Sequence, residues 1–434
     1  MRYLIKTLGC KVNQIESAQL AENLEREGYC PASEGEKADL CILNTCTVTA
    51  RTDAECRRVI RRLVRENPGA RIVVTGCYAE TDPEAIKAVP GIDRVVGKGR
   101  NGGLSEILID ASLRAEREEK VSVPRPSALL ERFGNRSRAF VKIQDGCEAF
   151  CSYCIVPYAR GRYRSEDPEQ VIRQVETFVQ NGYPEIVLSG IHLGAYGVDR
   201  REPGGLSKLL ARLIRIPGDF RIRLSSLEPM EVDDALIDLV TGEEKVCNHL
   251  HIPLQCGDDA ILARMKRPYR TERYADLVLR LRERDPAMAI GTDLIAGFPG
   301  EDDASFERSF QFLETLPLTH FHVFPYSVRS GTVAADLNGG VPGDVKKERC
   351  QFLRELGCAK NRRFRERMVG RTLQAVATGT AISRKSAPVF LTNNYLKVLL
   401  PHPQKSLPLI FSVKVLQVSD DMLLVETAYH DEKP

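Results

Sequence analysis

Three cysteines in one short loop are the residues of this chain whose types and spacing most clearly indicate chemistry. Cys147, Cys151 and Cys154 have the spacing C-x3-C-x2-C and follow the apolar run 140–143. Three thiolates from one loop can bind three irons of a [4Fe-4S] cube and leave the fourth iron open to a small molecule. A closed structural cluster needs a fourth cysteine nearby, but the next one is Cys247. The loop therefore predicts an iron–sulfur cluster with one open coordination site.

Two other interpretations of the loop are a zinc site and three unrelated thiols. The spacing, with the aromatic Tyr153 just before the last cysteine, resembles the radical S-adenosylmethionine (SAM) superfamily. In that superfamily the open iron chelates SAM, and an electron from the cluster cleaves the sulfonium bond to give a 5′-deoxyadenosyl radical. The resemblance thus implies radical chemistry.

The length and composition of the chain limit its domain number, its partners and its compartment only broadly. The 434 residues are enough for two or three domains, and 43% apolar with 28% charged residues is ordinary for a globular protein. The 62 basic and 59 acidic residues give a net charge of only +3, so net charge does not indicate a nucleic-acid partner. No signal peptide or membrane-spanning run is expected, which favours the cytosol. Thirteen cysteines, an odd number, favour metal ligands and free thiols over a disulfide framework.

The first hundred residues predict a parallel α/β domain. Apolar runs at 3–7, 39–44 and 71–75 read as strands that alternate with helices. Asn13 and Glu16 are expected to form a capping box at the start of the first helix, which Gly28 should end. A later helix carries five arginines between Arg57 and Arg65.

A second cysteine triad falls at the ends of these strands. Cys10, Cys46 and Cys77 each follow a predicted strand, although they lie far apart in the sequence. Ligands of open α/β sheets gather at the carboxyl ends of the strands, so the three thiols should meet at one edge and bind an auxiliary cluster. The neighbouring cysteines are expected to be small buried or surface residues: Cys30, Cys41 and Cys56.

The predicted architecture is α/β, with three domains and one linker. Residues 1–110 form the N-terminal α/β domain, 111–138 a charged linker, 139–368 a partial (βα)6 barrel and 369–434 a small β-barrel. The barrel strands are expected at 140–143, 185–189, 221–225, 249–252, 289–295 and 320–324. Cofactor groups belong at strand ends in such barrels. The candidate SAM-binding residues there are Ser189, Gly190, Ser225, Glu228 and Gln255.

Two features of the barrel invite other hypotheses. His249 and His251 alternate on one strand, but no third ligand of suitable spacing accompanies them, so we expect barrel-lining residues that form hydrogen bonds. The stretch 295–301 resembles a glycine-rich phosphate loop without its Lys-Ser/Thr, and we interpret it as a tight turn near the adenine of SAM.

Residues 360–418 change character, with eleven basic residues and one acidic residue, Glu366. Alternating runs at 373–377, 395–399, 410–418 and 423–427 predict short strands that close into a small barrel. A basic barrel beside an enzyme can hold RNA, although a merely solvated surface would have the same composition. Truncation after Val369 is expected to weaken RNA binding and its salt dependence while largely preserving SAM cleavage.

Taken together, these motifs resemble those of the radical SAM methylthiotransferases over nearly the whole chain. The supporting residues are Lys6 to Asn13, Asn44 to Val48, Gly76 to Tyr78, the Cys147–Cys154 loop and a C-terminal barrel of the TRAM type. Within the family, 188–194 and 393–398 are most similar to the MtaB-type branch, which acts on N6-threonylcarbamoyladenosine in tRNA. Departures are Cys256 in place of an expected serine and a Pro-His-Pro turn at 401–403.

The resemblance implies two [4Fe-4S] clusters and SAM as cofactors. Cys147, Cys151 and Cys154 would hold the catalytic cluster that cleaves SAM, and Cys10, Cys46 and Cys77 the auxiliary cluster that carries the sulfur. A second SAM would methylate that sulfur, and the methylthio group would be transferred to carbon 2 of the adenine. The implied partners are the tRNA anticodon stem-loop, a low-potential electron donor and an unknown sulfur donor, with a monomeric chain and no membrane. No catalytic acid–base dyad is visible in the sequence.

Three alternatives stay open. One is a relative that acts on isopentenyladenosine in tRNA, and another modifies an aspartate of a ribosomal protein. The third is a non-catalytic iron–sulfur protein that binds RNA. The basic loop 157–165 after the cysteines favours a nucleic-acid substrate.

Overall fold

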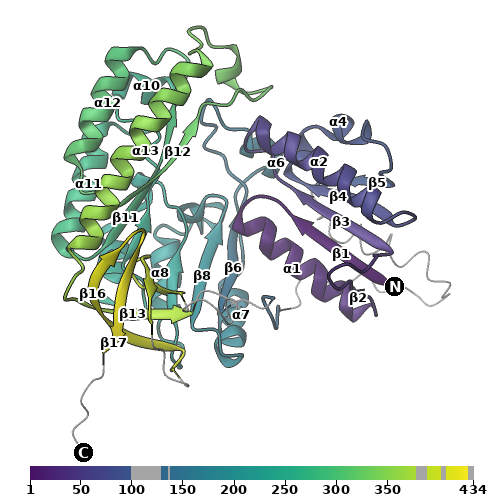
Figure 1. Cartoon of the computed structure of the whole chain (residues 1–434), viewed down its shortest axis with the longest axis horizontal. Helices are drawn as coiled ribbons and strands as arrows, with labels where there is room; N and C mark the ends of the chain where they lie inside the picture. Colours follow the sequence, from purple (N-terminus) through teal and green to yellow (C-terminus); the bar gives the residue numbers. More distant parts are fainter. Residues whose placement is uncertain (99–128, 135–136, 378–388, 402–406, 429–434) are drawn as a thin grey trace, which may run out of the picture. The chain divides into compact units, whose positions relative to one another are not determined.

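The structure, a computed structural model, describes residues 1–98, 129–134, 137–377, 389–401 and 407–428 (Figure 1). The chain divides into two compact units. Unit 1 comprises Met1–Leu130, Asp145–Arg162 and Ser327–Ala335, and unit 2 comprises Glu131–Gln144, Tyr163–Tyr326 and Asp336–Pro434. Most of the predicted linker lies outside the described residues, and the predicted division at residues 110, 138 and 368 stays a prediction.

Unit 1 is built on a five-stranded parallel sheet with the order β2-β1-β3-β4-β5. The three strands expected from the sequence, now β1, β3 and β4, are confirmed. The strands are β1 (Arg2–Thr7), β2 (Cys30–Pro31), β3 (Leu40–Thr45), β4 (Arg71–Gly76) and β5 (Arg94–Val96). The helices are α1 (Lys11–Arg26), α2 (Ala50–Glu66), α3 (Cys77–Thr81), α4 (Pro83–Lys87) and α6 (Val156–Arg160).

Helices cover both faces of this sheet, because the side chains of each strand alternate between two cores. Cys41 of β3 belongs to the core that includes Cys56 of α2. The next residue, Ile42, belongs to the other core, which includes Leu24 of α1. Cys41 and Cys56 are fully buried, as expected for small apolar residues. The sheet is therefore held between two layers of helix, with the carboxyl ends of its strands on one edge.

The expected capping box of α1 is wrong. The helix begins at Lys11 with Cys10 as its N-cap residue, and no side chain caps it. Asn13 lies inside the first turn and is fully buried. The expected end is confirmed, because Gly28 has φ +83° and its N–H donates to the Glu25 carbonyl.

The central part of unit 2 carries six parallel strands, all of which were predicted. Together with the two-residue strand β7, which was not predicted, they form two sheets, β7-β6-β8-β9 and β10-β11-β12. An isolated parallel bridge from Ile222 to Val246 joins β9 to the residues before β10. The strands are β6 (Arg138–Asp145), β7 (Arg164–Ser165), β8 (Glu185–Gly190), β9 (Arg221–Leu224), β10 (His249–His251), β11 (Ala289–Ala296) and β12 (His320–Pro325). This arrangement is the expected incomplete (βα)6 barrel.

The helices of unit 2 alternate with these strands. Asp167 caps α7 by accepting from the N–H groups of Glu169 and Gln170, with Pro168 in the first turn, as its sequence predicts. The helices are α7 (Pro168–Gln180), α8 (Gly205–Leu213), α9 (Asp234–Gly242), α10 (Asp259–Arg264), α11 (Thr271–Arg284), α12 (Asp303–Thr315) and α13 (Gly343–Glu366). Among the described residues, no helix combines the length and the apolarity that crossing a membrane requires.

The C-terminal residues close into a five-stranded barrel with the order β13-β14-β15-β17-β16, drawn in yellow-green and yellow in Figure 1. The strands are β13 (Thr372–Ala377), β14 (Val389–Thr392), β15 (Lys397–Leu399), β16 (Ile410–Ser419) and β17 (Met422–Thr427). The sequence did not predict β14. The basic stretch that begins at Lys360 starts before the barrel, because Lys360 to Glu366 form the end of α13.

The small barrel is fixed to β8 and β9 by a buried charge network. Glu185 of β8 is fully buried and is bound by Arg221 and Arg223 of β9. The two guanidinium groups also donate to main-chain carbonyls of the small barrel at Gln374, Leu391, Thr392 and Asn393. Removal of the small barrel would leave these donors without their carbonyl acceptors, so we expect truncation after Val369 to destabilise β8 and β9 as well. Preserved SAM cleavage in the truncated chain stays a prediction.

Candidate functional site

The auxiliary cysteines lie where the sequence placed them, at the carboxyl ends of three neighbouring strands. Cys10 follows β1, Cys46 follows β3 and Cys77 opens α3 directly after β4. Gly9, with φ +104°, allows the approach, because a Cβ atom there would lie 2.8 Å from the Cys46 sulfur. The backbone therefore brings Cys10 and Cys46 together only if residue 9 is glycine.

Asn13 ties these strand ends to one another. Its side-chain amide donates to the carbonyl of Leu8, at 2.8 Å, and to that of Thr45, at 2.9 Å. The Thr45 hydroxyl in turn donates to the Thr75 carbonyl, at 2.5 Å. The residues that precede the three cysteines are thus linked by buried hydrogen bonds, which is the role that Asn13 has in place of capping.

The thiols of the auxiliary triad influence one another. Burial, together with the neighbouring Cys77 and Cys10, raises the pKa of Cys46 to about 11. Burial also raises the pKa of Cys77, while the cation of Arg160 opposes this shift. Three thiolates at such a site would repel each other unless a positively charged group bound them, so the donor set fits iron and metal loading must displace protons.

The loop with the other triad folds on itself at the end of β6. Gly146 has φ +78°, and a Cβ atom there would lie 1.8 Å from the Arg162 carbonyl oxygen. The Cys147 N–H donates to the Gly161 carbonyl, and the Cys154 N–H donates to the Cys151 carbonyl, both at 2.9 Å. All three cysteines are partly exposed, as ligands of a cluster with an open iron must be.

A buried arginine connects the loop with the auxiliary triad. Arg160, the last residue of α6, has a side chain only 1% exposed. Its Nε donates to the Cys77 sulfur at 3.2 Å, and its Nη1 donates to Glu16 at 2.7 Å and to Asp145 at 3.2 Å. Its Nη2 donates to Asn13. Sequence reasoning missed this cluster, because it assigned Asn13 and Glu16 to a helix cap.

A second buried arginine supports the segment that follows Cys46. Arg329 donates to the carboxylate of Asp53 and to the hydroxyl of Thr47, both at 2.6 Å. Its segment also reaches the cysteine loop, because the Ala334 N–H donates to the Ser152 carbonyl at 2.7 Å. Residues 327–335 were not singled out from the sequence, because they contain no recognisable motif.

In unit 2, two of the candidate SAM-binding residues lie at the end of β8. Ser189 is buried, and its hydroxyl has no hydrogen-bond partner among the described residues. Gly190 packs against the Gln144 side chain, whose amide oxygen accepts the His192 N–H at 2.8 Å. A buried hydroxyl without a partner is costly, so Ser189 is suited to bind a ligand.

The other three candidates are already engaged in the protein. The Ser225 hydroxyl donates to the Leu188 carbonyl, and the Glu228 carboxylate pairs with Arg267. Gln255 has φ +72° and pairs through its backbone with Asp293 and Ile295 of β11. These contacts hold Ser225 and Gln255 at the ends of β9 and β10.

A histidine and aspartate cluster inside unit 2 was not foreseen. His251, Asp293 and His322 come from β10, β11 and β12, and their ligand atoms all lie within 4.8 Å of one another. One oxygen of Asp293 interacts with His251, at 2.9 Å, and with His322, at 3.1 Å. Burial opposes the charge of Asp293, but the two imidazoles outweigh it and hold the pKa of the carboxyl below its usual range. The cluster is already a satisfied hydrogen-bond network, and it corrects the expectation that no such group accompanies His251.

The stretch 295–301 forms a tight turn, as predicted. Gly297 and Gly300 both have positive φ, and the Gly297 N–H donates to the buried Glu301 carboxylate at 2.8 Å. Arg349 of α13 also binds this carboxylate, at 2.8 Å. The turn is therefore held by its own glutamate, and its proximity to adenine stays a prediction.

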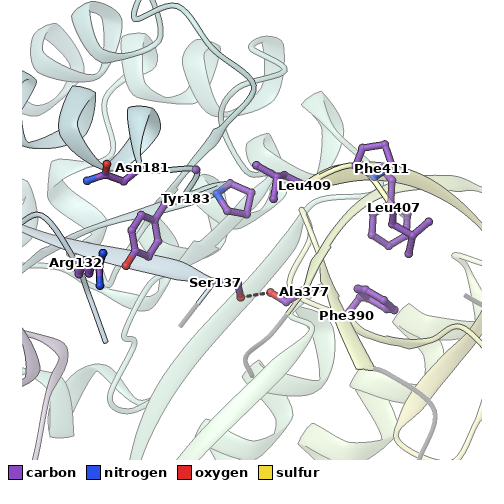
Figure 2. Close-up of a pocket in the computed structure, with 12 residues that line it drawn as sticks. Arg132, Ser137, Asn181, Tyr183, Ala377, Phe390, Leu407, Leu409 and Phe411 are labelled. Carbon is purple, nitrogen blue, oxygen red and sulfur yellow. Dashed lines mark hydrogen bonds between the residues drawn. The ribbon is translucent and has the colours of Figure 1, made fainter. Parts of the chain in front are cut away.

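One pocket of about 550 Å³ lies at the other ends of the barrel strands (Figure 2). Its walls include Tyr183, just before β8, and Phe390 and Phe411 of the small barrel. Ser137, just before β6, donates to the Ala377 carbonyl, so this pocket adjoins the connection to the small barrel. It is separate from the strand ends that carry Ser189 and Gly190.

Comparisons with known proteins found matches for the N-terminal α/β sheet and for the partial barrel. Residues 2–97 match the uncharacterized protein family UPF0004, and residues 141–313 match the radical SAM superfamily. A solved structure of the radical S-adenosylmethionine methyltransferase TsrM from Kitasatospora setae shares the fold, with TM-score 0.56, 18% identity and 77% coverage of each chain. Residues 141–313 thus form a radical SAM domain.

Relatives define the family more narrowly. The threonylcarbamoyladenosine tRNA methylthiotransferase MtaB of Bacillus subtilis is 38% identical over 426 residues, which cover 95% of this chain and 93% of that protein. A tRNA-2-methylthio-N(6)-dimethylallyladenosine synthase of Clostridium botulinum is 31% identical over 98% of this chain and 96% of that protein. This chain belongs to the radical SAM methylthiotransferase family.

Proposed function

We propose that this enzyme adds a methylthio group to carbon 2 of N6-threonylcarbamoyladenosine, next to the anticodon of tRNA. The observation that carries the proposal is the 38% identity to the Bacillus subtilis protein over 95% of the chain. Dimethylallyl-adenosine in tRNA is the alternative substrate, because relatives of that kind match at 31% identity.

The two cysteine triads fit two iron–sulfur clusters. Cys147, Cys151 and Cys154 would bind the SAM-cleaving cluster, since one loop offers three partly exposed thiols. Cys10, Cys46 and Cys77 would bind the auxiliary cluster at the sheet edge. When bound, the clusters would supply the electron that cleaves SAM and the sulfur that is transferred.

The chain's other residues would position the reactants. The buried Ser189 hydroxyl would donate a hydrogen bond to SAM, and Gly190 would let the cofactor approach β8 closely. Ser225, Glu228 and Gln255 would complete this side of the site at the ends of the neighbouring strands. Asn13 and Arg160 would hold the auxiliary thiols in place through the contacts they make in unit 1.

The proposed partners follow from this reaction. The substrate is the anticodon stem-loop of tRNA, and the exposed basic residues of the small barrel would contact its phosphates. A low-potential electron donor and a sulfur donor are also required. We expect a monomer that acts in the cytoplasm, where its tRNA substrate is found.

The test uses the full-length chain, reconstituted with iron and sulfide without oxygen. SAM, dithionite and one of two tRNAs are added, one tRNA carrying threonylcarbamoyladenosine and the other dimethylallyl-adenosine. Mass spectrometry of the digested nucleosides should detect the methylthio product only with the first tRNA. Product only with the second tRNA would support the alternative, and 5′-deoxyadenosine without product from either would point to another substrate.

A further inference from the structure

The strongest observation outside the expected ligand sets is the environment of Arg160. Its guanidinium group is almost fully buried, yet each of its nitrogens is engaged. Nε donates to the sulfur of Cys77 at 3.2 Å, within the range of a hydrogen bond to sulfur. This is a specific contact between a cation and one proposed cluster ligand, made by a residue six positions after Cys154.

Among the described residues, two carboxylates and a second cation surround Arg160. Glu16 and Asp145 are its anionic partners, at 2.7 Å and 3.2 Å. Lys98 is a second cation, whose Nζ donates to the other oxygen of Glu16 at 2.5 Å. Two cations and two carboxylates therefore balance before the thiolate of Cys77 is counted, so the ligand sulfur lies in a field that these four side chains set.

Such a contact has a defined effect on an iron–sulfur cluster. Reduction adds a negative charge to the cluster, and hydrogen bonds to the ligand sulfur and nearby positive charge stabilise that reduced form. In a buried site this effect is little screened by water. A donor at Cys77 should therefore raise the reduction potential of a cluster bound there.

We propose that Arg160 is a positioning residue that sets the reduction potential of the auxiliary cluster through its hydrogen bond to Cys77. Its anchor is Asp145, the residue that opens the other cysteine loop, so the same side chain joins the start of that loop to the auxiliary ligands. Glu16 acts in the opposite direction, because its negative charge partly offsets the guanidinium group. The inference rests on the proposed function, which assigns a cluster to Cys10, Cys46 and Cys77.

The experiment isolates the auxiliary cluster. A full-length chain with Cys147, Cys151 and Cys154 replaced by Ala is reconstituted with iron and sulfide, and its midpoint potential is measured by redox titration followed by electron paramagnetic resonance. In this background, Arg160→Lys and Arg160→Gln should each shift the midpoint to more negative values. Glu16→Gln should shift it to more positive values. Opposite shifts from two neighbouring residues would not result from a general loosening of the site.

The matched control is Arg349→Lys. Arg349 is also a buried, ion-paired arginine, but it belongs to unit 2 and binds Glu301 and Asp303 and not a ligand sulfur, so its replacement should leave the midpoint nearly unchanged. If Arg160→Gln does not retain iron, the midpoints of Arg160→Lys and Glu16→Gln provide the test. Unchanged midpoints in Arg160→Lys and Glu16→Gln, with iron content intact, would overturn this inference but not the proposed function. A background chain that binds no iron would overturn the auxiliary site itself and the inference with it.

Discussion

Arg221 binds the buried carboxylate of Glu185, with its Nε 2.8 Å from the carboxylate oxygen, and uses its remaining nitrogens to bind carbonyl groups of the small barrel. Burial opposes the charge of Glu185, but Arg223 and Arg221 outweigh it and hold the pKa of the carboxyl well below its usual range. Glu185 therefore stays charged and fixes two arginines that reach into another part of the fold.

Replacing this carboxylate should destabilise unit 2. Glu185→Gln would leave two buried guanidinium groups without a counter-charge, at a cost of about 3–5 kcal/mol. Glu169→Gln is the control, because Glu169 forms an exposed pair with Arg212 whose loss should cost about 0–1 kcal/mol. Denaturant unfolding of both variants measures the difference, and equal losses would mean that the buried network contributes little.

The cysteine loop should be essential for SAM cleavage. Cys151→Ala leaves two thiolates in the loop, which should not hold an open cluster firmly, so 5′-deoxyadenosine formation should fall to background. The measurement is anaerobic turnover of SAM with dithionite after reconstitution. Cys30→Ala, an exposed cysteine outside both triads, is the control and should keep full activity. Retained cleavage in Cys151→Ala would contradict the ligand assignment.

The auxiliary triad should be separable from SAM cleavage. Replacing Cys10, Cys46 and Cys77 together by Ala should lower bound iron by about half, since one of two clusters is lost. 5′-Deoxyadenosine should still form, while the methylthio nucleoside disappears. Iron analysis and nucleoside mass spectrometry on the same sample give both readouts. Full iron content together with product would show that these cysteines are packing residues.

Basic residues of the small barrel should contribute to tRNA binding. Arg371, Lys397 and Lys414 are exposed, and each phosphate contact adds about 0.7–0.9 to the slope of log affinity against log salt. Replacing all three by Ala should lower the slope by about 2–3 units if each contacts a phosphate. Arg201, Lys208 and Arg212, exposed elsewhere in unit 2, form the control set. Equal slopes for both sets would point to another surface, and the arginines of α2 are the next to test.

His320 should make the fold sensitive to mild acid. Burial, together with the neighbouring His251 and His322, lowers its pKa to about 3, while Asp293 opposes this shift. An unfolded histidine has a pKa of about 6.5, so the unfolded chain binds a proton that the folded chain does not as pH falls below that value. Stability should therefore decrease by up to about 1.4 kcal/mol per pH unit between about 6.5 and 3.

Melting temperatures at pH 7.5, 6.5 and 5.5 test this dependence. His320→Gln removes the titrating group and should flatten the decline, even if the variant is less stable at pH 7.5. A decline of the same steepness in the variant would assign the acid sensitivity to other groups.

The sequence predicted most of the strands because parallel α/β folds repeat short apolar runs between helices. It missed β14, a four-residue run with no alternation to mark it. It also missed Asp293 and His322 as partners of His251, because their proximity depends on strand register. Asp293 lies opposite His322 in the β11–β12 pair, and no local pattern in the sequence encodes that alignment.

The roles of Asn13 and Glu16 were misjudged for a related reason. An asparagine followed three residues later by a glutamate is the local pattern of a helix cap. Whether such a side chain caps its own helix or binds a distant loop depends on what tertiary packing brings next to it. Here the packing brings Thr45 and Arg160.

Unit 1 is assembled from three separate stretches of chain, and this has a consequence for how the protein is made. Residues 327–335 contribute Arg329, which holds the segment after Cys46 through Asp53 and Thr47. A ribosome synthesises the chain from its N-terminus, so all six cysteines of the two triads emerge long before this support does. The first 130 residues can form their sheet early, but the unit around both triads is complete only after Ala335 has been added. Insertion of iron into a fully supported site must therefore wait for roughly three quarters of translation.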